Sequence, residues 1–134
     1  MKKKILVTRK LLQENEEKLK ELFDVKLNSK DELYTPEKIL KLSKDCDGIL
    51  SAITDQFNKD LIEKLSPSIK IIANFAVGFG NIDVNVAAKK NIVVTNTPEV
   101  LDDSTADISI LLLLGASRKV LEARRAAELQ NWKW

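Results

Sequence analysis

The chain has 134 residues, a length that suits one ordinary domain with its own hydrophobic core. Hydrophobic residues make up 44% and charged residues 31%, which is typical of a folded soluble protein and excludes an intrinsically disordered chain. Lys and Arg number 22 and Asp and Glu number 20, so the net charge of +2 gives no reason to expect a nucleic acid or an anionic membrane as partner.

Short apolar runs alternate with helical patterns along the first hundred residues. Strands are predicted at 4–8, 25–27, 48–50, 69–74 and 92–95, and helices at 11–22, from Pro36 onward, at 59–65 and at 84–90. Thr35 is the predicted N-cap of the helix that starts at Pro36. The strands are rich in Ile, Val and Leu without alternation, which indicates burial on both faces, as in parallel sheets. The pattern therefore predicts an α/β fold: a flavodoxin-like doubly wound parallel sheet of five strands in the order 2-1-3-4-5.

A long C-terminal helix is predicted from Ser104 to about Leu129. The segment 104–107 fits a capping box, in which Ser104 is the N-cap and Asp107 reaches back to it. The first half of this helix is almost entirely apolar, so it must be buried on most sides. The predicted sheet can cover only one side of this helix. We therefore expect the helix to pack against something outside the first hundred residues. Because 131–134 provide no polar capping tail, we expect the chain to stop where a second domain should begin.

Two residue types restrict the chemistry. The chain has no histidine, which excludes His-based triads, most zinc sites and a histidine general acid, so we expect no metal site. Cys46 is the single cysteine, so no internal disulfide can form, and a reducing cytoplasm is the expected compartment. Asp45 and Asp47 flank Cys46 and discourage a thiolate, which favours buried packing over a nucleophilic role. The longest apolar run, 110–114, is far shorter than the ~20 residues that cross a membrane.

A small-residue loop follows the fourth predicted strand. Glycine at Gly78 lets the backbone approach a ligand closely, and successive N–H groups at Val77 and Gly78 could hold a small carboxylate. The spacing alone favours an ordinary turn that uses glycine for its dihedral angles. Gly78 and Gly80 also suggest a dinucleotide fingerprint, but the third glycine position is Asp83, which is better interpreted as a helix cap.

Other candidates lie at neighbouring strand ends and at the start of the long helix. Ile53 and Thr54 follow the third strand and line a pocket or pack a loop. Thr105 either supports the helix cap or presents its hydroxyl, with the exposed N–H groups of the helix start, to a cofactor phosphate or amide. Asp102 and Asp103 favour the helix dipole, and a catalytic carboxylate pair is the weaker interpretation.

Several motifs together resemble one enzyme family. The segments 76–83, 93–98 and 104–107 occur in the right order, and 45–50 and 69–73 fit the same template. The chain resembles the D-isomer-specific 2-hydroxyacid dehydrogenases over essentially its whole length, and is most similar to their glyoxylate/hydroxypyruvate reductase branch.

The resemblance implies a flavodoxin-like substrate-binding domain at 1–100 and an interdomain and dimerisation helix at 101–134, leading to an NAD(P)-binding Rossmann domain that the chain lacks. It implies reduction of a small 2-keto acid, of the glyoxylate or hydroxypyruvate type, to a D-2-hydroxy acid with NADH or NADPH. By the resemblance, the N–H groups of Val77 and Gly78 hold the substrate carboxylate, Ile53 lines the substrate pocket and Thr105 approaches the nicotinamide side of the cofactor. It also implies a homodimer formed through the long helix.

Two departures from the family pattern matter. The family usually has Asp where this chain has Gly80, so we expect a looser loop. The chain also ends before the Gly-x-Gly-x-x-Gly fingerprint and before the family's arginine, acid and histidine, so no catalytic residue is assigned. We therefore expect the chain alone to bind cofactor poorly and to be inactive. The keto acid and the choice between NAD and NADP stay open.

One alternative comes from a different functional class. The chain could be a stand-alone flavodoxin-like binding or interaction module, without catalysis, that dimerises through its apolar helix. A phospho-receiver domain is less favoured, because acids are expected at the end of its first strand, where this chain has Thr8 and Arg9.

Overall fold

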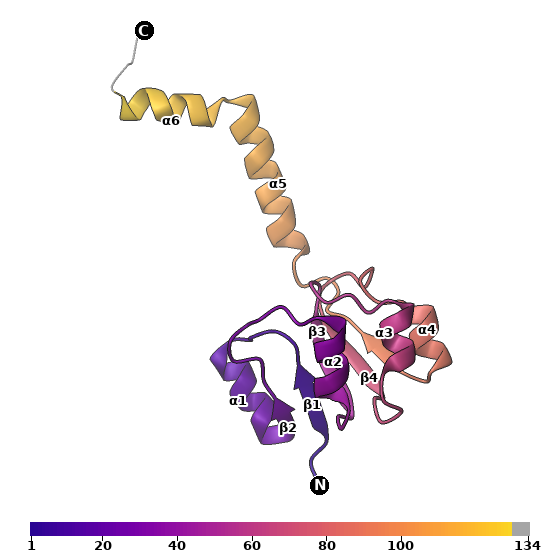
Figure 1. Cartoon of the computed structure of the whole chain (residues 1–134). Helices are drawn as coiled ribbons and strands as arrows, with labels where there is room; N and C mark the ends of the chain where they lie inside the picture. The colour runs from indigo at the N-terminus through magenta and orange to yellow at the C-terminus, as the bar shows by residue number, and fades with distance from the viewer. Residues whose placement is uncertain (130–134) are drawn as a thin grey trace. The chain divides into compact units, whose positions relative to one another are not determined.

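The computed structural model describes residues 1–129, which divide into a first unit, Met1–Pro98, and a second unit that begins at Glu99 (Figure 1). The first unit contains β1 (Lys4–Val7), α1 (Gln13–Leu22), β2 (Asp24–Lys26), α2 (Pro36–Ser43), β3 (Gly48–Ala52), α3 (Lys59–Lys64), β4 (Ile71–Phe75), α4 (Val84–Lys89) and β5 (Val93–Thr95). The second unit contains α5 (Asp102–Ser117) and α6 (Val120–Glu128). Within residues 1–129, no helix combines the length and apolar character that crossing a bilayer requires.

The five strands of the first unit form one parallel sheet in the order β2-β1-β3-β4-β5, which confirms the predicted fold class. The longest pairing joins β3 to β4, from Gly48 opposite Ile71 to Ala52 opposite Phe75. These two central strands therefore end side by side at the carboxyl edge of the sheet. That edge is where open α/β sheets place their ligands.

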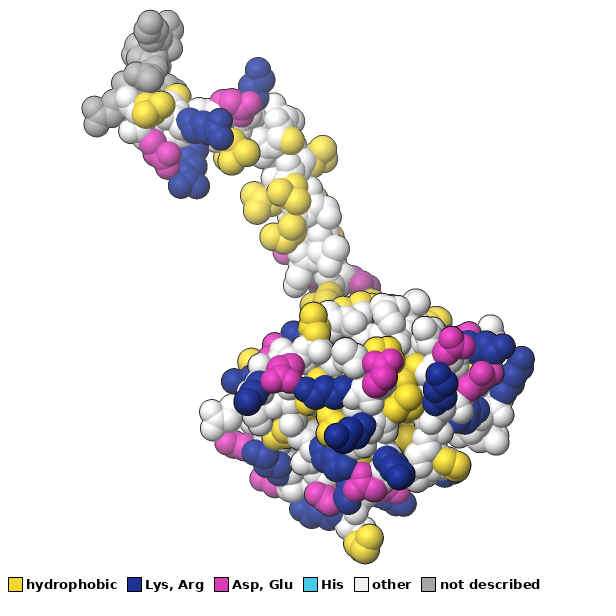
Figure 2. Space-filling view, viewed as in Figure 1, with side chains coloured by type: hydrophobic (Ala, Val, Ile, Leu, Met, Phe, Trp, Pro, Cys, Tyr) yellow, Lys and Arg dark blue, Asp and Glu magenta, His cyan; other side chains and the backbone are white. Residues whose placement is uncertain are grey.

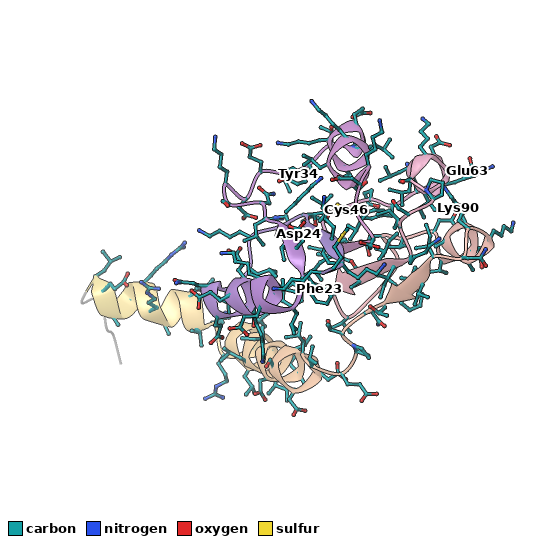
Figure 3. All side chains as sticks on the ribbon, turned by 90° about the horizontal axis from the view of Figure 1, so that it is seen from below. Phe23, Asp24, Tyr34, Cys46, Glu63 and Lys90 are labelled. Atoms are coloured by element: carbon teal, nitrogen blue, oxygen red, sulfur yellow. The ribbon has the colours of Figure 1, made fainter. Side chains whose placement is uncertain are left out.

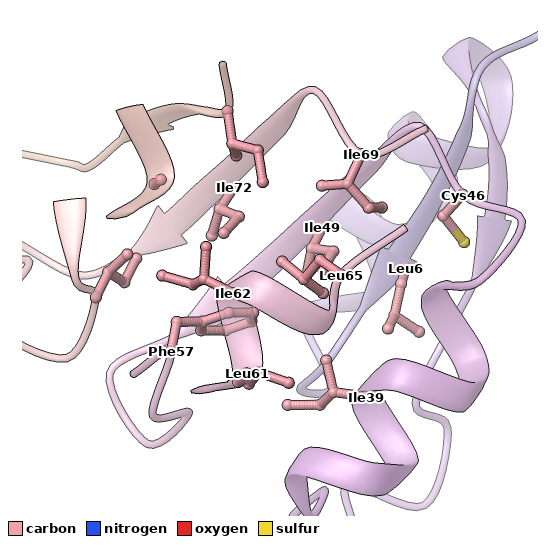
Figure 4. Close-up of a cluster of buried hydrophobic side chains, with 13 residues drawn as sticks. Leu6, Ile39, Cys46, Ile49, Phe57, Leu61, Ile62, Leu65, Ile69 and Ile72 are labelled. Carbon is pink, nitrogen blue, oxygen red and sulfur yellow. The ribbon is translucent and has the colours of Figure 1, made fainter. Parts of the chain in front are cut away.

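The core of the first unit lies between one face of the sheet and helices α2, α3 and α4. We call this face of the sheet the core face (Figure 4). Leu6, Ile49 and Ile72 project from the strands onto side chains such as Ile39 of α2 and Ile62 of α3. Thr35 caps α2, because its side chain accepts a hydrogen bond from the N–H of Lys38, as the sequence predicts. Cys46 is fully buried, and burial raises the pKa of its thiol, which confirms its packing role.

The opposite face of the sheet carries only α1, and we call it the α1 face. Figure 3 shows Phe23, at the end of α1, on the other side of the sheet from Tyr34, which packs against the core. Ile71 is only half-buried on this face and Val93 is exposed, so the prediction of burial on both faces is wrong for the first unit by itself. The cause is topological. Right-handed crossovers put α2, α3 and α4 on one face and leave α1 alone on the other, since only the first connection runs in the reverse direction.

The second unit differs from the prediction in three ways. Helix α5 begins at Asp102 with Leu101 as N-cap and has no side-chain cap, so the capping box at Ser104 is wrong. The helical segment is not continuous, because Lys119 adopts a left-handed conformation (φ 50°, ψ 45°) and separates α5 from α6. No residue of α5 is buried within the described chain, and Figure 2 shows its apolar side chains on the surface. The predicted chain end at 131–134 lies outside the described residues.

Candidate functional site

Polar side chains gather at the carboxyl ends of the central strands of the first unit. Ser51 lies near the end of β3, Asn74 lies near the end of β4 and Asn96 follows β5 directly. The loop at 76–78 follows β4, and Ile53 follows β3. Because β3 and β4 are paired neighbours, the sheet brings Ile53 and the loop at 76–78 to the same edge.

The loop at 76–78 is held through its carbonyl oxygens. The carbonyl of Ala76 accepts a hydrogen bond from the N–H of Thr97 at 2.9 Å. The carbonyl of Val77 accepts from Nδ2 of Asn96 at 2.7 Å, and that of Gly78 from Nδ2 of Asn74 at 3.0 Å. Three consecutive carbonyls are therefore occupied by protein donors.

Two N–H groups of the same loop are free, whereas the N–H of Ala76 donates to the carbonyl of Asn74 at 2.8 Å. Among residues 1–129, neither the N–H of Val77 nor that of Gly78 donates a hydrogen bond to the protein. Gly78 is exposed, so its N–H is open to a ligand. Two adjacent unpaired N–H groups carry partial positive charge, which suits a carboxylate.

The structure also tests why residue 78 is glycine. No glycine among the described residues has a positive φ, so Gly78 is not required for its dihedral angles. A Cβ atom added there would meet no atom within 4 Å, so close packing does not require glycine either. These facts count against the ordinary-turn interpretation, and close approach of a ligand remains as a reason for the glycine. Gly80 is equally free, and nothing in the structure explains glycine there.

A buried amide network lies beneath the loop. Nδ2 of Asn74 donates to Oδ1 of Asn81 at 3.0 Å, and Oγ of Ser51 donates to Oδ1 of Asn74 at 3.1 Å. Nδ2 of Asn81 donates to the carbonyl of Asp55 at 2.9 Å. This network links the loop after β3 to the loop after β4. The sequence patterns do not single out these asparagines, although their position at strand ends is a usable signal.

The turn that carries Ile53 is anchored by a buried carboxylate. Asp55 accepts hydrogen bonds from the hydroxyl of Thr8 and from the N–H of Ala52. Ile53 remains 53% exposed in the first unit, so its side chain is available to line a ligand site at this edge. Its neighbour Thr54 accepts a hydrogen bond from Arg9 at 3.0 Å.

Arg9 adds a cation to the same edge, but its charge is already paired. Its guanidinium donates two hydrogen bonds to the carboxylate of Asp31, at 2.7 and 2.9 Å. The pairing holds the pKa of Asp31 well below its ordinary value. Arg9 is therefore a structural link between the loops after β1, β2 and β3.

Thr105 belongs to the second unit and lies in the first turn of α5. Its N–H donates to the carbonyl of Leu101 at 2.9 Å, so this N–H is not among the free N–H groups of the helix start. The reason is that α5 begins at Asp102, with its N-cap at Leu101 in place of the predicted N-cap Ser104. Asp102 and Asp103 lie in its first turn, where their charges favour the helix dipole as expected.

A hollow of about 340 Å³ adjoins the end of β5. It is lined by Phe79, Val84, Ala88, Ile92, Val94, Thr95 and Asn96. Val77, Gly78 and Ile53 do not line it, so the free N–H groups lie outside this hollow.

The described residues do not build a cradle for the pyrophosphate of a dinucleotide. Such cradles hold the phosphates at a helix N-terminus. The helix after Gly78 and Gly80 is α4, and the carboxylate of Asp83 accepts the N–H of Val86 at its start. A carboxylate in that place repels phosphate, which supports the interpretation of Asp83 as a cap. Within residues 1–129, no group of three or more His, Cys, Asp and Glu residues is placed to hold a metal ion.

Comparisons with known proteins find curated relatives of one kind. A glyoxylate reductase from Korarchaeum cryptofilum is 41% identical over 134 residues, which are 99% of this chain and 40% of the relative. One from Pyrococcus horikoshii is 35% identical over 133 residues, again 99% of this chain and 40% of the relative. The chain thus spans about 40% of the length of these curated relatives.

A solved structure has the same fold. An NADPH-dependent glyoxylate/hydroxypyruvate reductase from Sinorhizobium meliloti, in complex with NADP and malonate, is 32% identical with a TM-score of 0.79. The match covers 98% of this chain and 40% of that chain. The family model described as D-isomer specific 2-hydroxyacid dehydrogenase, catalytic domain, matches residues 5–133. The chain therefore belongs to the D-isomer-specific 2-hydroxyacid dehydrogenase family.

Proposed function

We propose that the chain is the substrate-binding part of an enzyme that reduces a 2-keto acid, of the glyoxylate or hydroxypyruvate type, to a D-2-hydroxy acid with NADH or NADPH. The observation that carries this proposal is the pair of unpaired N–H groups at Val77 and Gly78, at the carboxyl edge of the sheet. The similarity to glyoxylate reductases over 99% of the chain supports it.

The site would act by binding and orienting the substrate. The N–H groups of Val77 and Gly78 donate to the substrate carboxylate, and charge-assisted hydrogen bonds of this kind are stronger than neutral ones. Ile53 gives the keto acid an apolar wall from the neighbouring strand end. Fixing the carboxylate and the side chain together leaves the keto carbon in one orientation, which is how positioning residues lower a reaction barrier. This chain has no histidine to deliver a proton, so no catalytic residue is assigned in it.

The remaining parts of the proposal concern the division of labour within the protein. Residues 1–100 form the substrate-binding domain, and 101–134 form the interdomain and dimerisation segment. The cofactor is bound mainly outside these 134 residues, with Thr105 approaching its nicotinamide side. A reducing cytoplasmic location suits the buried free thiol of Cys46.

We propose a homodimer in which α5 is the contact. Its leucines are exposed within the described chain, although a helix that is apolar on all sides needs cover. The same observation favours the second candidate function, a stand-alone interaction module that uses α5 and performs no catalysis.

Two matched variants test the carboxylate site. A Cβ atom meets no atom within 4 Å at Gly78 or at Gly80, so Gly78→Ala and Gly80→Ala are both expected to fold. Malonate titrated into the ¹⁵N-labelled 134-residue chain should shift the amide resonances of Val77 and Gly78. Gly78→Ala should weaken the response several-fold, because its methyl group occupies the ligand's approach, while Gly80→Ala should not.

Equal malonate affinity in both variants would contradict the assigned site.

The split between substrate and cofactor parts has a separate test, which is fluorescence titration of the same chain with NADH. We expect no micromolar binding, because the described residues lack a pyrophosphate cradle. Micromolar NADH binding would contradict the proposed division.

A further inference from the structure

We propose that Asn96 is a positioning residue for substrate binding: together with the backbone N–H of Thr97 it holds the loop at 76–78 so that two N–H groups face the substrate carboxylate. The inference rests on the proposed function, because it assumes that Val77 and Gly78 are the carboxylate donors. It assigns a role to the end of β5, an edge strand that has no part in the carboxylate contact itself.

The first step is the geometry of the peptide unit. In a trans peptide the C=O and N–H groups of one unit point in opposite directions, and no cis peptide occurs among the described residues. The carbonyl of Ala76 shares its unit with the N–H of Val77, and the carbonyl of Val77 shares its unit with the N–H of Gly78. The direction of each carbonyl therefore sets the direction of each free N–H.

The second step is that both carbonyls are held from the same place. Thr97 donates its N–H to the carbonyl of Ala76 at 2.9 Å, and Asn96 donates Nδ2 to the carbonyl of Val77 at 2.7 Å. These donors are adjacent residues just after β5. Since both carbonyls face the end of β5, both N–H groups face away from it, and they are presented together to one ligand.

The third step concerns the strength of the donors. A peptide carbonyl that accepts a hydrogen bond polarises its unit and makes the N–H of that unit a better donor. Asn96 is half-buried and bridges nineteen positions along the chain to Val77, so its contact is part of the packed structure. The side chain thus both aims and strengthens the N–H of Gly78.

Asparagine is suited to this task, and its nearest analogue is not. The substitution Asn96→Asp keeps almost the same side-chain shape but removes the donor, and it sets a carboxylate against the carbonyl of Val77. The lost contact should release the unit that carries the N–H of Gly78. Asn74, which is buried beneath the loop, anchors the next carbonyl and is a less clean target because it also bonds Asn81.

The test compares three variants of the 134-residue chain: Asn96→Ala, Asn96→Asp and, as control, Asn85→Ala. Asn85 is exposed on α4 and is not part of the loop contacts. Malonate is titrated at constant ionic strength while the amide resonances of Val77 and Gly78 are followed. We expect both Asn96 variants to lower the apparent affinity for malonate by about five- to tenfold, which corresponds to the contribution of one hydrogen bond. Asn85→Ala should leave this affinity unchanged.

A second readout separates positioning from general stability. The ¹⁵N order parameters of Val77 and Gly78 should fall in both Asn96 variants, while the amide resonances of β3 and β4 stay in place. Asn96→Asp covers the case in which Asn96→Ala fails to fold, because it keeps the volume of the side chain.

The outcomes distinguish the inference from the function on which it rests. If the unaltered chain shows no malonate response at Val77 and Gly78, the carboxylate site and this inference both fall. If the unaltered chain responds and the Asn96 variants bind equally well, the site stands and the positioning role is overturned. Equal loss in Asn85→Ala would also overturn it.

Discussion

The two units of the chain use the same apolar residue types with opposite results. In the first unit, leucine, isoleucine and phenylalanine side chains such as Phe57 and Ile62 are completely buried. In the second unit, α5 and α6 contain no buried residue, and Leu112 is 67% exposed. An apolar sequence therefore indicates that a segment favours burial, but it does not identify the surface that covers the segment.

The arrangement of the apolar residues explains this difference. Helices α2 and α3 each have an apolar stripe, which the sheet covers from one side. Helix α5 has leucine on every side, so a single surface cannot cover it. The first unit therefore buries a core of its own, although its α1 face is only partly covered, whereas the second has exposed apolar surface throughout α5.

The largest expected effect is on the stability of the first unit. Phe57→Ala removes a fully buried ring and should lower the free energy of unfolding by about 3–5 kcal/mol. Leu121→Ala, at a side chain that is 69% exposed on α6, should change it by less than about 0.5 kcal/mol. Urea unfolding, followed by the amide resonances of β3 and β4, measures both. Similar losses in the two variants would show that the units are not independent in packing.

The next effect concerns the proposed dimer. Leu112→Asp places a charge in the middle of α5 and should convert the dimer to a monomer, because a desolvated unpaired charge is costly. Leu33→Asp is the matched control, since Leu33 is 68% exposed in the first unit and Leu112 is 67% exposed. Light scattering coupled to gel filtration gives the masses. A monomeric unaltered chain, or a dimeric Leu112→Asp variant, would rule out α5 as the contact.

A smaller effect is the pH dependence of the first unit. Lys26 and Lys4 hold the pKa of Asp45 well below its ordinary value of 3.8. A lowered folded-state pKa stabilises the fold above the ordinary value, and this contribution disappears as the pH falls from 3.8 through the folded-state pKa. Asp45→Asn should therefore lower the melting temperature slightly at about pH 7, and the difference should shrink in acid.

The exposure of Asp45 limits the expected difference in melting temperature and guides the choice of control. Because the carboxylate is exposed, salt should also reduce the difference. Asp103→Asn, in the first turn of α5, should leave the melting of the first unit unchanged at every pH. A difference at Asp45 that persists below the folded-state pKa would point to a cause other than its charge.

The smallest effect is at the break between α5 and α6. Lys119 is left-handed, which costs a residue with a side chain about 1 kcal/mol, so Lys119→Gly should relieve strain at the break. Circular dichroism should show equal or slightly higher helicity. Ala116→Gly, inside α5, should lower helicity instead, since glycine weakens a helix interior. Loss of helicity in both variants would mean that the left-handed conformation of Lys119 does not reduce the helicity of the unaltered chain.

The fold was open to sequence reasoning because its signals are local. Strand runs such as 48–50, the Thr35 cap and the Asp83 cap depend on residues close in sequence, and the order 2-1-3-4-5 is a common one for doubly wound parallel sheets. The start of α5 was not predictable in this way. Ser104 and Asp107 have the right spacing for a capping box, but the helix begins earlier at Asp102, where acids also suit the first turn.

The same distinction between local and long-range signals applies to the candidate site. The sequence by itself determined that a glycine loop follows β4 and that Ile53 follows β3, because strand ends and loop residues are read directly from the chain. Only the tertiary structure decided that Asn96, nineteen positions beyond Val77, holds the loop carbonyl and leaves the N–H groups free. Hydrogen bonds between distant residues depend on strand pairing, and no local pattern encodes them.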